Sequence, residues 1–243
     1  MIQTVQASPA FLPLPGQFNE DAHRTWADLI AIHRARREHQ LHPMFMRGLH
    51  ALGMDTDRIP SLDEVNTKLN FLTGWKGVFV KGLEESDGFY KLLRDKKFPI
   101  GHFLRDRKDL NYTPDVVHDF YGHIPFHADE AYADYCQKYG ELACQFLGDA
   151  KRLRMLERYF WFTNEFGLVQ TAHGRRVFGA GVASSVGECE YALSERPEVV
   201  PFDVATVCAQ EFRIDQTQPR LFLLESVEQL YASFPKLEDC IRS

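Results

Sequence analysis

Two histidines and one glutamate are the residues best suited to chemistry in this sequence. His118 and His123 lie five positions apart in the segment Val116–His123, and Glu165 stands in the aromatic segment Phe160–Gly167. Two imidazoles and one carboxylate can occupy one face of a metal and leave the opposite face open, as in non-heme Fe(II) oxygenases, which need open positions for dioxygen. The three residues therefore predict a metal centre.

The spacing of the two histidines does not suit an ideal α-helix. Five residues correspond to a rotation of about 140°, so the pair does not share a helix face as an i, i+4 pair would. The two side chains could converge if the helix ends or loosens between them, and Gly122 is the residue that would permit this. Taken alone, the pair is more often solvent-exposed or part of a core than a metal site.

Glu165 strengthens the prediction because it lies among aromatic and small residues, where a carboxylate would be largely buried. A buried, unpaired carboxylate is costly, so it needs a cation, several donors or a metal, and a salt bridge to an arginine is the simplest alternative. Three N and O ligands without a thiolate fit Fe(II), although zinc could bind the same atoms. A zinc hydrolase would more typically show HExxH, whereas here Asp119 follows His118, so zinc hydrolysis is the second hypothesis.

Composition and charge narrow the class of protein. The chain has 243 residues, with 44% hydrophobic and 26% charged residues, which fits one large folded domain. A net charge of −6 argues against nucleic acid and against an anionic membrane as partners. No apolar run approaches the roughly 20 residues that span a bilayer, and the N-terminus lacks a signal-peptide pattern. Five cysteines without a CxxC pair indicate reduced thiols, which predicts a cytoplasmic protein.

Helical patterns dominate the elements that must position these residues. Periodicity and capping residues predict helices over 20–40, 61–71, 86–94, from Thr113-Pro114 through His118, over 129–147, 151–165, 185–194 and 203–210, and from Ser226. Strands are predicted over 75–81 and 221–224, with a hairpin over 169–177 that turns at His173-Gly174. We expect an extended N-terminal arm over 1–18 and a single catalytic domain over 19–243, mainly α with a few short β-strands.

Three sequence motifs, in their order along the chain, resemble those of the pterin-dependent aromatic amino acid hydroxylases, most closely the short bacterial phenylalanine 4-hydroxylases. The segments that carry the resemblance are Pro114–Pro125, Tyr159–Leu168 and Phe178–Glu188, and the likeness extends from about Ile59 to Leu224. The resemblance implies a mononuclear Fe(II) held by His118, His123 and Glu165. It also implies a tetrahydropterin, with dioxygen as co-substrate, and hydroxylation of an aromatic amino acid ring.

Phenylalanine to tyrosine is the leading reaction that the resemblance implies. The sequence leaves open hydroxylation of tryptophan or of another aromatic amino acid in a biosynthetic pathway. A catalytically silent relative that binds an aromatic amino acid is a third hypothesis, against which the intact set of three ligands argues.

The resemblance also implies residues that bind the substrate. Arg105 holds the place of an arginine that grips the substrate carboxylate, and Asp115 that of the acid that orients it. Ser184 matches a serine near the first histidine, and Trp161 and Phe166 match walls of the ring pocket. Without the resemblance, Arg105 reads as a surface charge and the two aromatic residues read equally well as ordinary core.

For the pterin, Phe89 matches the ring that stacks on the cofactor, while Gly82 and Leu83 match the adjacent backbone. Asp119 stands where the family prefers a glutamate that reaches toward the pterin, and a carboxylate one methylene shorter can act through a bridging water. Phe160 replaces a tyrosine found in animal members.

Two departures from the family concern the substrate entrance and assembly. The lead-in Tyr112–Asp115 is two residues shorter than usual and lacks a glutamate before the proline, which bears on substrate identity rather than on the metal. There is no room for an animal-type regulatory domain, and Ser226–Ile241 is too short for a coiled-coil tetramerisation helix, so we expect a monomer.

Overall fold

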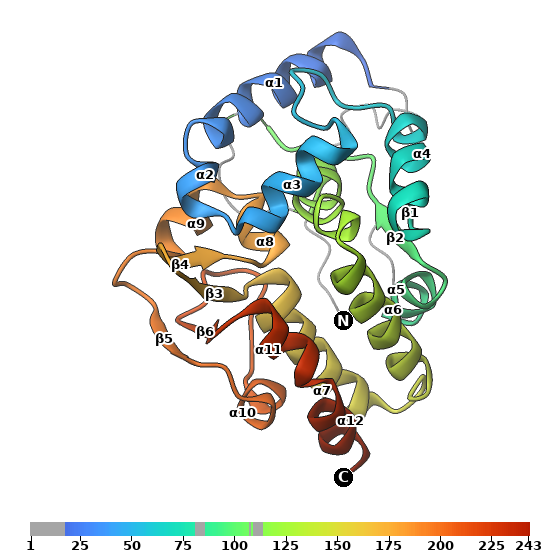
Figure 1. Cartoon of the computed structure of the whole chain (residues 1–243), viewed down its shortest axis with the longest axis vertical. Coiled ribbons are helices and arrows are strands. Elements are labelled where there is room, and N and C mark those ends of the chain that lie inside the picture. Colours follow the sequence, from blue (N-terminus) through green and yellow to red (C-terminus); the bar gives the residue numbers. More distant parts are fainter. Residues whose placement is uncertain (1–17, 81–85, 107, 109–113) are drawn as a thin grey trace.

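Helices form most of the molecule, and two small β-sheets lie toward opposite sides of it (Figure 1). The computed structural model describes residues 18–80, 86–106, 108 and 114–243, so the predicted arm over 1–18 lies outside the described residues except for Phe18. One continuous hydrophobic core runs from Trp26 to Ile241. The prediction of a mainly α fold with a few short strands is confirmed.

The α-helices are α1 (Glu20–Arg34), α2 (Arg37–Gln40), α3 (Pro43–Leu52), α4 (Leu62–Thr73), α5 (Ser86–Arg94), α6 (Glu130–Cys144), α7 (Ala150–Phe160), α8 (Ala180–Ala183), α9 (Val186–Ala192), α10 (Val204–Ala209), α11 (Val227–Ala232) and α12 (Phe234–Arg242). Within the described residues, two π-helices, η1 (Val117–His123) and η3 (Trp161–Glu165), and one 3-10 helix, η2 (Phe126–Ala128), complete the helical part. No helix within the described residues is long and apolar enough to cross a membrane.

Both sheets are built from four- and five-residue strands. β1 (Lys76–Phe79) and β2 (Lys97–Ile100) pair in parallel and are connected through α5. The second sheet has the order β4-β3-β6-β5, formed by β3 (Leu168–Thr171), β4 (Gly174–Val177), β5 (Glu198–Pro201) and β6 (Arg220–Leu224). β3 and β4 form the predicted antiparallel hairpin, and β6 pairs in parallel with both β3 and β5.

Capping residues explain why two of the predicted helix starts, at Ser61 and Asp129, are met. The Ser61 hydroxyl accepts from the Glu64 amide at the start of α4, and Asp129 Oδ1 accepts from the Tyr132 amide, 3.2 Å away, at the start of α6. Strands β2 and β5 were not predicted, since each carries a proline, Pro99 or Pro201, that disfavours an interior strand. Both strands lie at an edge of their sheet, where the missing amide is tolerated.

The long helix predicted over 20–40 is wrong, since it is interrupted between α1 and α2. Ala35 caps α1, and Arg36 leaves the helical region with φ −128°. The interruption lets Arg37, which is 4% exposed, form an ion pair with Asp55. A buried guanidinium needs such a partner, and a continuous helix would not place it there.

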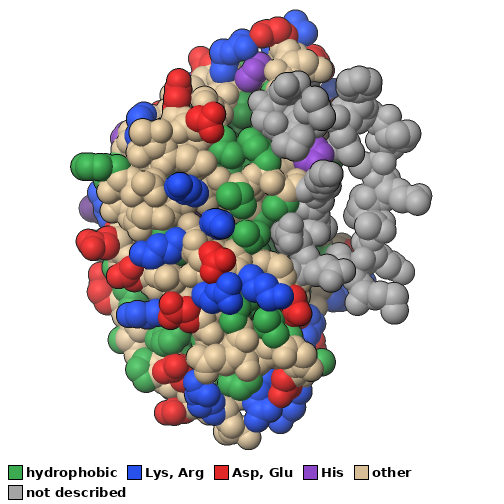
Figure 2. Space-filling model, turned by 90° about the vertical axis from the view of Figure 1, so that its right-hand side faces the viewer, with side chains coloured by type: hydrophobic (Ala, Val, Ile, Leu, Met, Phe, Trp, Pro, Cys, Tyr) green, Lys and Arg blue, Asp and Glu red, His purple; other side chains and the backbone are tan. Residues whose placement is uncertain are grey.

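The surface matches the mixed charge of the sequence. On the face drawn in Figure 2, basic and acidic side chains of the described residues are intermixed rather than separated into a basic region. Nucleic-acid binding requires such a basic region to neutralise phosphates.

Candidate active site

The π-helix η1 brings the two histidines together. A π-helix forms i→i+5 hydrogen bonds, so residues five apart lie on one face, and such turns are frequent at functional sites. The Nε2 atoms of His118 and His123 are 3.2 Å apart, with their ring planes at 87°. The predicted convergence of the pair is present, and its cause is the wider helix.

The predicted start of this helix is corrected. The helical run does not begin at Thr113-Pro114: Thr113 lies outside the described residues, Pro114 is not helical, and η1 spans Val117–His123. Asp115 marks the start, since its Oδ1 accepts from the His118 amide at 2.9 Å. Gly122 lies within the widened turn, between the two histidines as predicted. A Cβ there would lie 2.8 Å from the Ala180 carbonyl oxygen, so the glycine also allows α8 to pack closely on η1.

The π-helix η3 presents Glu165 at the end of the helix predicted over 151–165. Its last turn widens as the Phe166 amide bonds the Trp161 carbonyl at 2.8 Å, five residues back. Gly179 packs against the outside of this turn, where a Cβ would lie 2.2 Å from the Glu165 carbonyl oxygen. The two π turns are therefore both in contact with the segment around α8.

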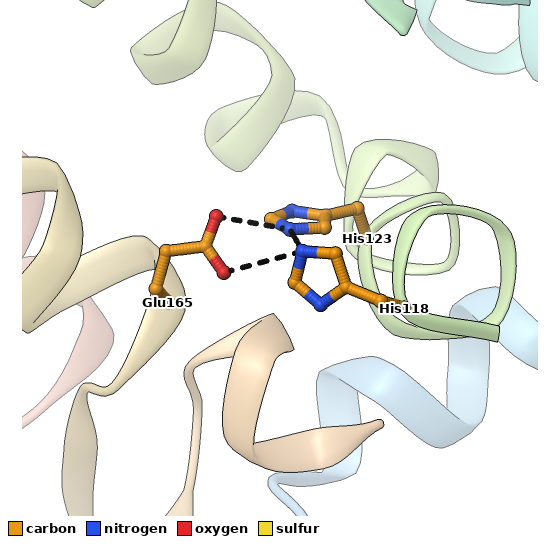
Figure 3. Close-up of side chains that lie close together, drawn as sticks. All are labelled: His118, His123 and Glu165. Carbon is orange, nitrogen blue, oxygen red and sulfur yellow. Dashed lines mark hydrogen bonds and ion pairs between the residues drawn. The ribbon is translucent and has the colours of Figure 1, made fainter. Parts of the chain in front are cut away.

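The three predicted ligands converge on one point. Glu165 reaches across from η3 to both imidazoles of η1 (Figure 3). Its Oε1 lies 3.1 Å from His123 Nε2, and its Oε2 lies 3.6 Å from His118 Nε2. All three residues are buried, and their donor atoms lie within 4.8 Å of one another, a grouping able to hold a metal ion.

The electrostatics of the three residues suit a cation. Burial lowers the pKa of His118 and of His123 to about 3, so both imidazoles are neutral at neutral pH and keep a lone pair for a metal. Burial raises the pKa of Glu165, while His118 and the Gly181 amide lower it. Glu165 Oε2 is buried without a hydrogen-bond donor among the described residues, which a metal ion at this position would satisfy.

Arg105 and Asp115 form the buried pair that the sequence predicted only through the resemblance. The Arg105 Nε and Nη2 atoms donate to the two Asp115 carboxylate oxygens at 2.9 and 2.6 Å. Arg105 is 3% exposed and Asp115 is 0% exposed, so the reading of Arg105 as a surface charge is wrong. A bidentate pair of this kind fixes the plane of the guanidinium.

Ser184 connects this pair to the candidate metal ligands. Its carbonyl accepts from Arg105 Nη1 at 3.2 Å, and its hydroxyl lies 3.2 Å from His118 Nδ1. The buried Ser184 therefore contacts both the predicted carboxylate-binding residue and the first histidine. Hydrogen bonds to the outer nitrogen of a ligand histidine fix its ring orientation.

The two predicted walls of the ring pocket stack on each other. Trp161 and Phe166 have ring centroids 4.6 Å apart, with an angle of 26° between their planes. Phe212, which the sequence analysis did not single out, stacks on Trp161 at 4.4 Å. Trp161 follows the last residue of α7 and Phe166 follows Glu165, so both flank the ligand-bearing turn.

The residues predicted for the pterin form an aromatic group beside the histidines. Phe89 packs edge-to-face on Phe160 at 5.3 Å and on Phe98 at 6.1 Å. Phe98 in turn stacks on the His123 ring at 4.4 Å. Gly82 and Leu83 lie outside the described residues. Phe98 was not predicted as a site residue, and the strand that carries it, β2, was not predicted either.

Asp119 lies beside the candidate metal ligands. Its Oδ2 accepts from the Gly101 amide at 2.8 Å, and its Oδ1 lies 3.8 Å from His118 Nε2. Burial raises the pKa of this carboxyl well above its usual range, against the lowering effect of the Gly101 amide. The carboxylate therefore faces the site that its neighbour His118 helps to form.

This arrangement, a two-histidine, one-carboxylate site on two π turns of a mainly α domain, defines a class of protein. Residues 16–241 match the family of biopterin-dependent aromatic amino acid hydroxylases, and the chain belongs to that family.

Its relatives include bacterial phenylalanine-4-hydroxylases. The chain is 38% identical over 231 residues to the enzyme of Chromobacterium violaceum, covering 90% of this chain and 75% of that one. It is 41% identical over 189 residues to the enzyme of Caulobacter vibrioides, covering 76% of this chain and 64% of that one.

Solved structures of the Chromobacterium violaceum enzyme share the fold. The form with iron and phenylalanine bound matches with a TM-score of 0.85 at 34% identity, covering 97% of this chain and 89% of that one. The form with iron(III) and 7,8-dihydrobiopterin bound matches with a TM-score of 0.86 at 36% identity, covering 93% and 85%.

Proposed function

We propose that this protein is an Fe(II)- and tetrahydropterin-dependent monooxygenase that hydroxylates the ring of an aromatic amino acid, with phenylalanine as substrate and tyrosine as product. The observation that carries the proposal is the convergence of His118, His123 and Glu165 from two separate π-helices. Family membership and the ligands bound in the related structures support the same activity.

The three ligands bind the metal on one side only, which leaves the other side for small molecules. When bound, Fe(II) and the tetrahydropterin supply the electrons that activate dioxygen. The protein groups hold the reactants in register and keep water away from them. Both histidines stay neutral through burial, so they need no deprotonation before they bind the metal.

Arg105 binds the carboxylate of the amino acid in this proposal. A guanidinium that Asp115 holds in a fixed plane presents its donors in the geometry that a carboxylate accepts, which a lysine ammonium does not reproduce. The Trp161 and Phe166 rings then pack against the substrate ring. The Ser184 contacts to Arg105 and His118 keep the carboxylate-binding group in register with the metal.

The pterin is proposed to stack on Phe89, beside Phe160, with the backbone of Gly82 and Leu83 next to it. Asp119 faces the same region and binds the pterin directly or through a bridging water. The support for this side is the aromatic group that links Phe89 through Phe98 to the His123 ring.

Anaerobic reconstitution tests the activity directly. The apoprotein receives Fe(II) or Zn(II), then tetrahydropterin and oxygen, with phenylalanine, tryptophan and tyrosine offered separately and products measured by mass spectrometry. We expect tyrosine from phenylalanine with Fe(II) and no product with Zn(II). Activity restored by zinc instead would favour the hydrolase hypothesis, and no hydroxylated product with any substrate would overturn the proposal.

Replacement of each ligand tests the site. His118→Ala, His123→Ala and Glu165→Ala should each lose iron and turnover while the circular dichroism spectrum stays that of the wild type. Stoichiometric iron in all three purified variants would show that the metal binds elsewhere.

We also propose that the protein works as a monomer in the cytoplasm. The five cysteines are free thiols, three of them buried, which suits a reducing compartment. Light scattering coupled to gel filtration tests the first point, since a monomer has the chain mass of 28.1 kDa. A mass of twice that value or more would contradict it.

A further inference from the structure

Asn164, the residue before Glu165, is held by a polar network that the proposed reaction does not use. It is 1% exposed and lies in η3. Its side chain contacts α6, whereas the Glu165 side chain contacts the two histidines of η1. Two consecutive residues of one π turn are therefore anchored to two different elements.

The Asn164 carboxamide has partners on both of its polar atoms. Its Nδ2 donates to the Tyr132 hydroxyl at 2.9 Å and to Cys136 Sγ at 3.6 Å. Its Oδ1 accepts from the Tyr135 hydroxyl at 3.3 Å and lies 3.0 Å from Thr163 Oγ1. A carboxamide has two donors and two acceptor sites. Here both donors and one acceptor site are engaged, since the single Thr163 hydroxyl proton has a closer acceptor in the Tyr159 carbonyl at 2.6 Å.

All partners in this network are buried, like the asparagine. Tyr132, Cys136 and Thr163 are at most 1% exposed, and Tyr135 is 4% exposed. Water has no ready access to replace a lost partner, and a satisfied buried network specifies one arrangement of the groups that form it. The rotation of the η3 turn about its axis is therefore fixed from the α6 side.

Tyr132 extends this link to the histidine-bearing segment. Its ring packs against the rings of Phe126 and His127, at 5.6 and 5.3 Å, just beyond the end of η1. Asn164 thus connects the turn that carries Glu165 with the segment that follows His123. The connection runs behind the ligands and touches none of their donor atoms.

A π turn needs such a constraint because its hydrogen-bond register competes with the ordinary α-helical one. In η3 the Phe166 amide bonds the carbonyl five residues back, while the next amide, that of Gly167, bonds Thr163, four residues back. A change of register would rotate Glu165 away from the histidines.

We propose that Asn164 is a positioning residue for the metal centre: by binding Tyr132 and Tyr135 of α6, it sets the rotation of η3 that aims Glu165 at His118 and His123. This inference rests on the proposed function only in taking those three residues as a metal site.

Titration of the apoprotein with Co(II), followed by visible absorption, tests this role without turnover. Asn164→Leu has a similar volume and no polar atoms, and we expect its Co(II) affinity to fall about tenfold or more, with an altered d–d spectrum that reports changed ligand geometry. Tyr132→Phe and Tyr135→Phe each remove only one hydroxyl, so we expect them to disturb folding less than Asn164→Leu does. Each should show the same spectral change to a smaller extent.

Tyr139→Phe is the matched control. It removes an equally buried α6 hydroxyl, which donates to the Leu156 carbonyl of α7 at 2.8 Å and does not contact Asn164. Its Co(II) affinity and spectrum should equal those of the wild type even if its melting temperature falls.

The outcomes separate this inference from the proposed function. If Asn164→Leu, or both tyrosine variants where the leucine variant fails to fold, bind Co(II) with wild-type affinity and spectrum, the network is only structural and the inference is wrong. If the wild type itself binds no Co(II), or Glu165→Ala binds it equally well, the metal centre is wrong and the inference falls with it.

Discussion

The two π-helices present ligands to the same point but are held in different ways. η1 is anchored by charge: the Asp115 carboxylate accepts from the His118 amide and forms a buried ion pair with Arg105. η3 is anchored by neutral groups, the Asn164 carboxamide and the tyrosine hydroxyls of α6. The charged anchor also serves the proposed substrate site, whereas the neutral anchor serves only the geometry of Glu165. Damage to the two should therefore have different consequences.

Loss of the charged anchor should have the largest effect. Asp115→Asn leaves the buried Arg105 guanidinium without its counter-charge, which costs about 3–5 kcal/mol when one partner of a buried pair is removed. Urea unfolding should show that loss, and the KM for phenylalanine should rise while the KM for the pterin changes little.

The control for this prediction is Asp215→Asn, whose partner Arg213 is 65% exposed. Exposed ion pairs contribute little, so its unfolding should match the wild type. Equal stability of the Asp115 and Asp215 variants would show that η1 does not depend on the buried charge.

Glycine-to-alanine variants beside each π turn test how tightly each turn is packed. The Cβ of Gly179→Ala would meet three backbone atoms of η3 and its following residue at 2.2–2.5 Å, whereas that of Gly122→Ala would meet the Ala180 carbonyl at 2.8 Å. We expect the free energy of unfolding to fall by about 3 kcal/mol in Gly179→Ala and by about 1 kcal/mol in Gly122→Ala, since overpacking costs about 1–3 kcal/mol. Thermal unfolding measures both, and the reverse order would contradict the comparison.

The loss of folding stability in acid should arise in part from a buried histidine that packs against η1. His33, whose ring lies 5.2 Å from that of Tyr121 in η1, has its pKa lowered from 6.5 to about 3 by burial and then by Arg105 and Arg37. Below pH 6.5 the unfolded chain binds a proton at His33 that the folded chain does not, so stability falls as the pH falls toward 3.

For His33 alone, the free energy of unfolding should fall by about 2 kcal/mol between pH 7 and pH 5. Urea unfolding at both pH values should show a pH-dependent loss that is smaller by this amount in His33→Gln than in the wild type. Asn164→Leu, which removes no titrating group, should keep the wild-type pH dependence. An unchanged loss in His33→Gln would contradict the assignment.

Ser184 joins the charged anchor to His118, and its hydroxyl is expected to affect metal binding rather than stability. Ser184→Ala removes the hydroxyl beside His118 Nδ1 but keeps the carbonyl that binds Arg105. Metal affinity should fall about tenfold, or about 1.4 kcal/mol, while the KM for phenylalanine changes little. Isothermal titration with Co(II) measures the change, and a rise in KM without a change in metal affinity would reverse the roles given to the two Ser184 atoms.

Much of the fold could be read locally from the sequence. Ser61 and Asp129 start the helices that their side chains cap, and the hairpin turns beside Gly174, whose φ of 93° suits glycine. Such signals depend on a few neighbouring residues. The interruption between α1 and α2 was missed: the buried Arg37 that follows it pairs with Asp55, 18 residues further along the chain, and no local pattern indicates that contact.

The sequence by itself determined which residues can bind a metal, since His118, His123 and Glu165 are chemically suited to it and Glu165 lies in surroundings that would bury it. Only the tertiary structure decided that they meet. An ideal α-helix points the two histidines in different directions, whereas the π turns that bring the three residues together contact distant segments at Gly122, Gly179 and Asn164. An α-helix and a π-helix differ only in whether each amide bonds the carbonyl four or five residues back. Local sequence does not distinguish these two patterns, so packing against distant segments decides between them.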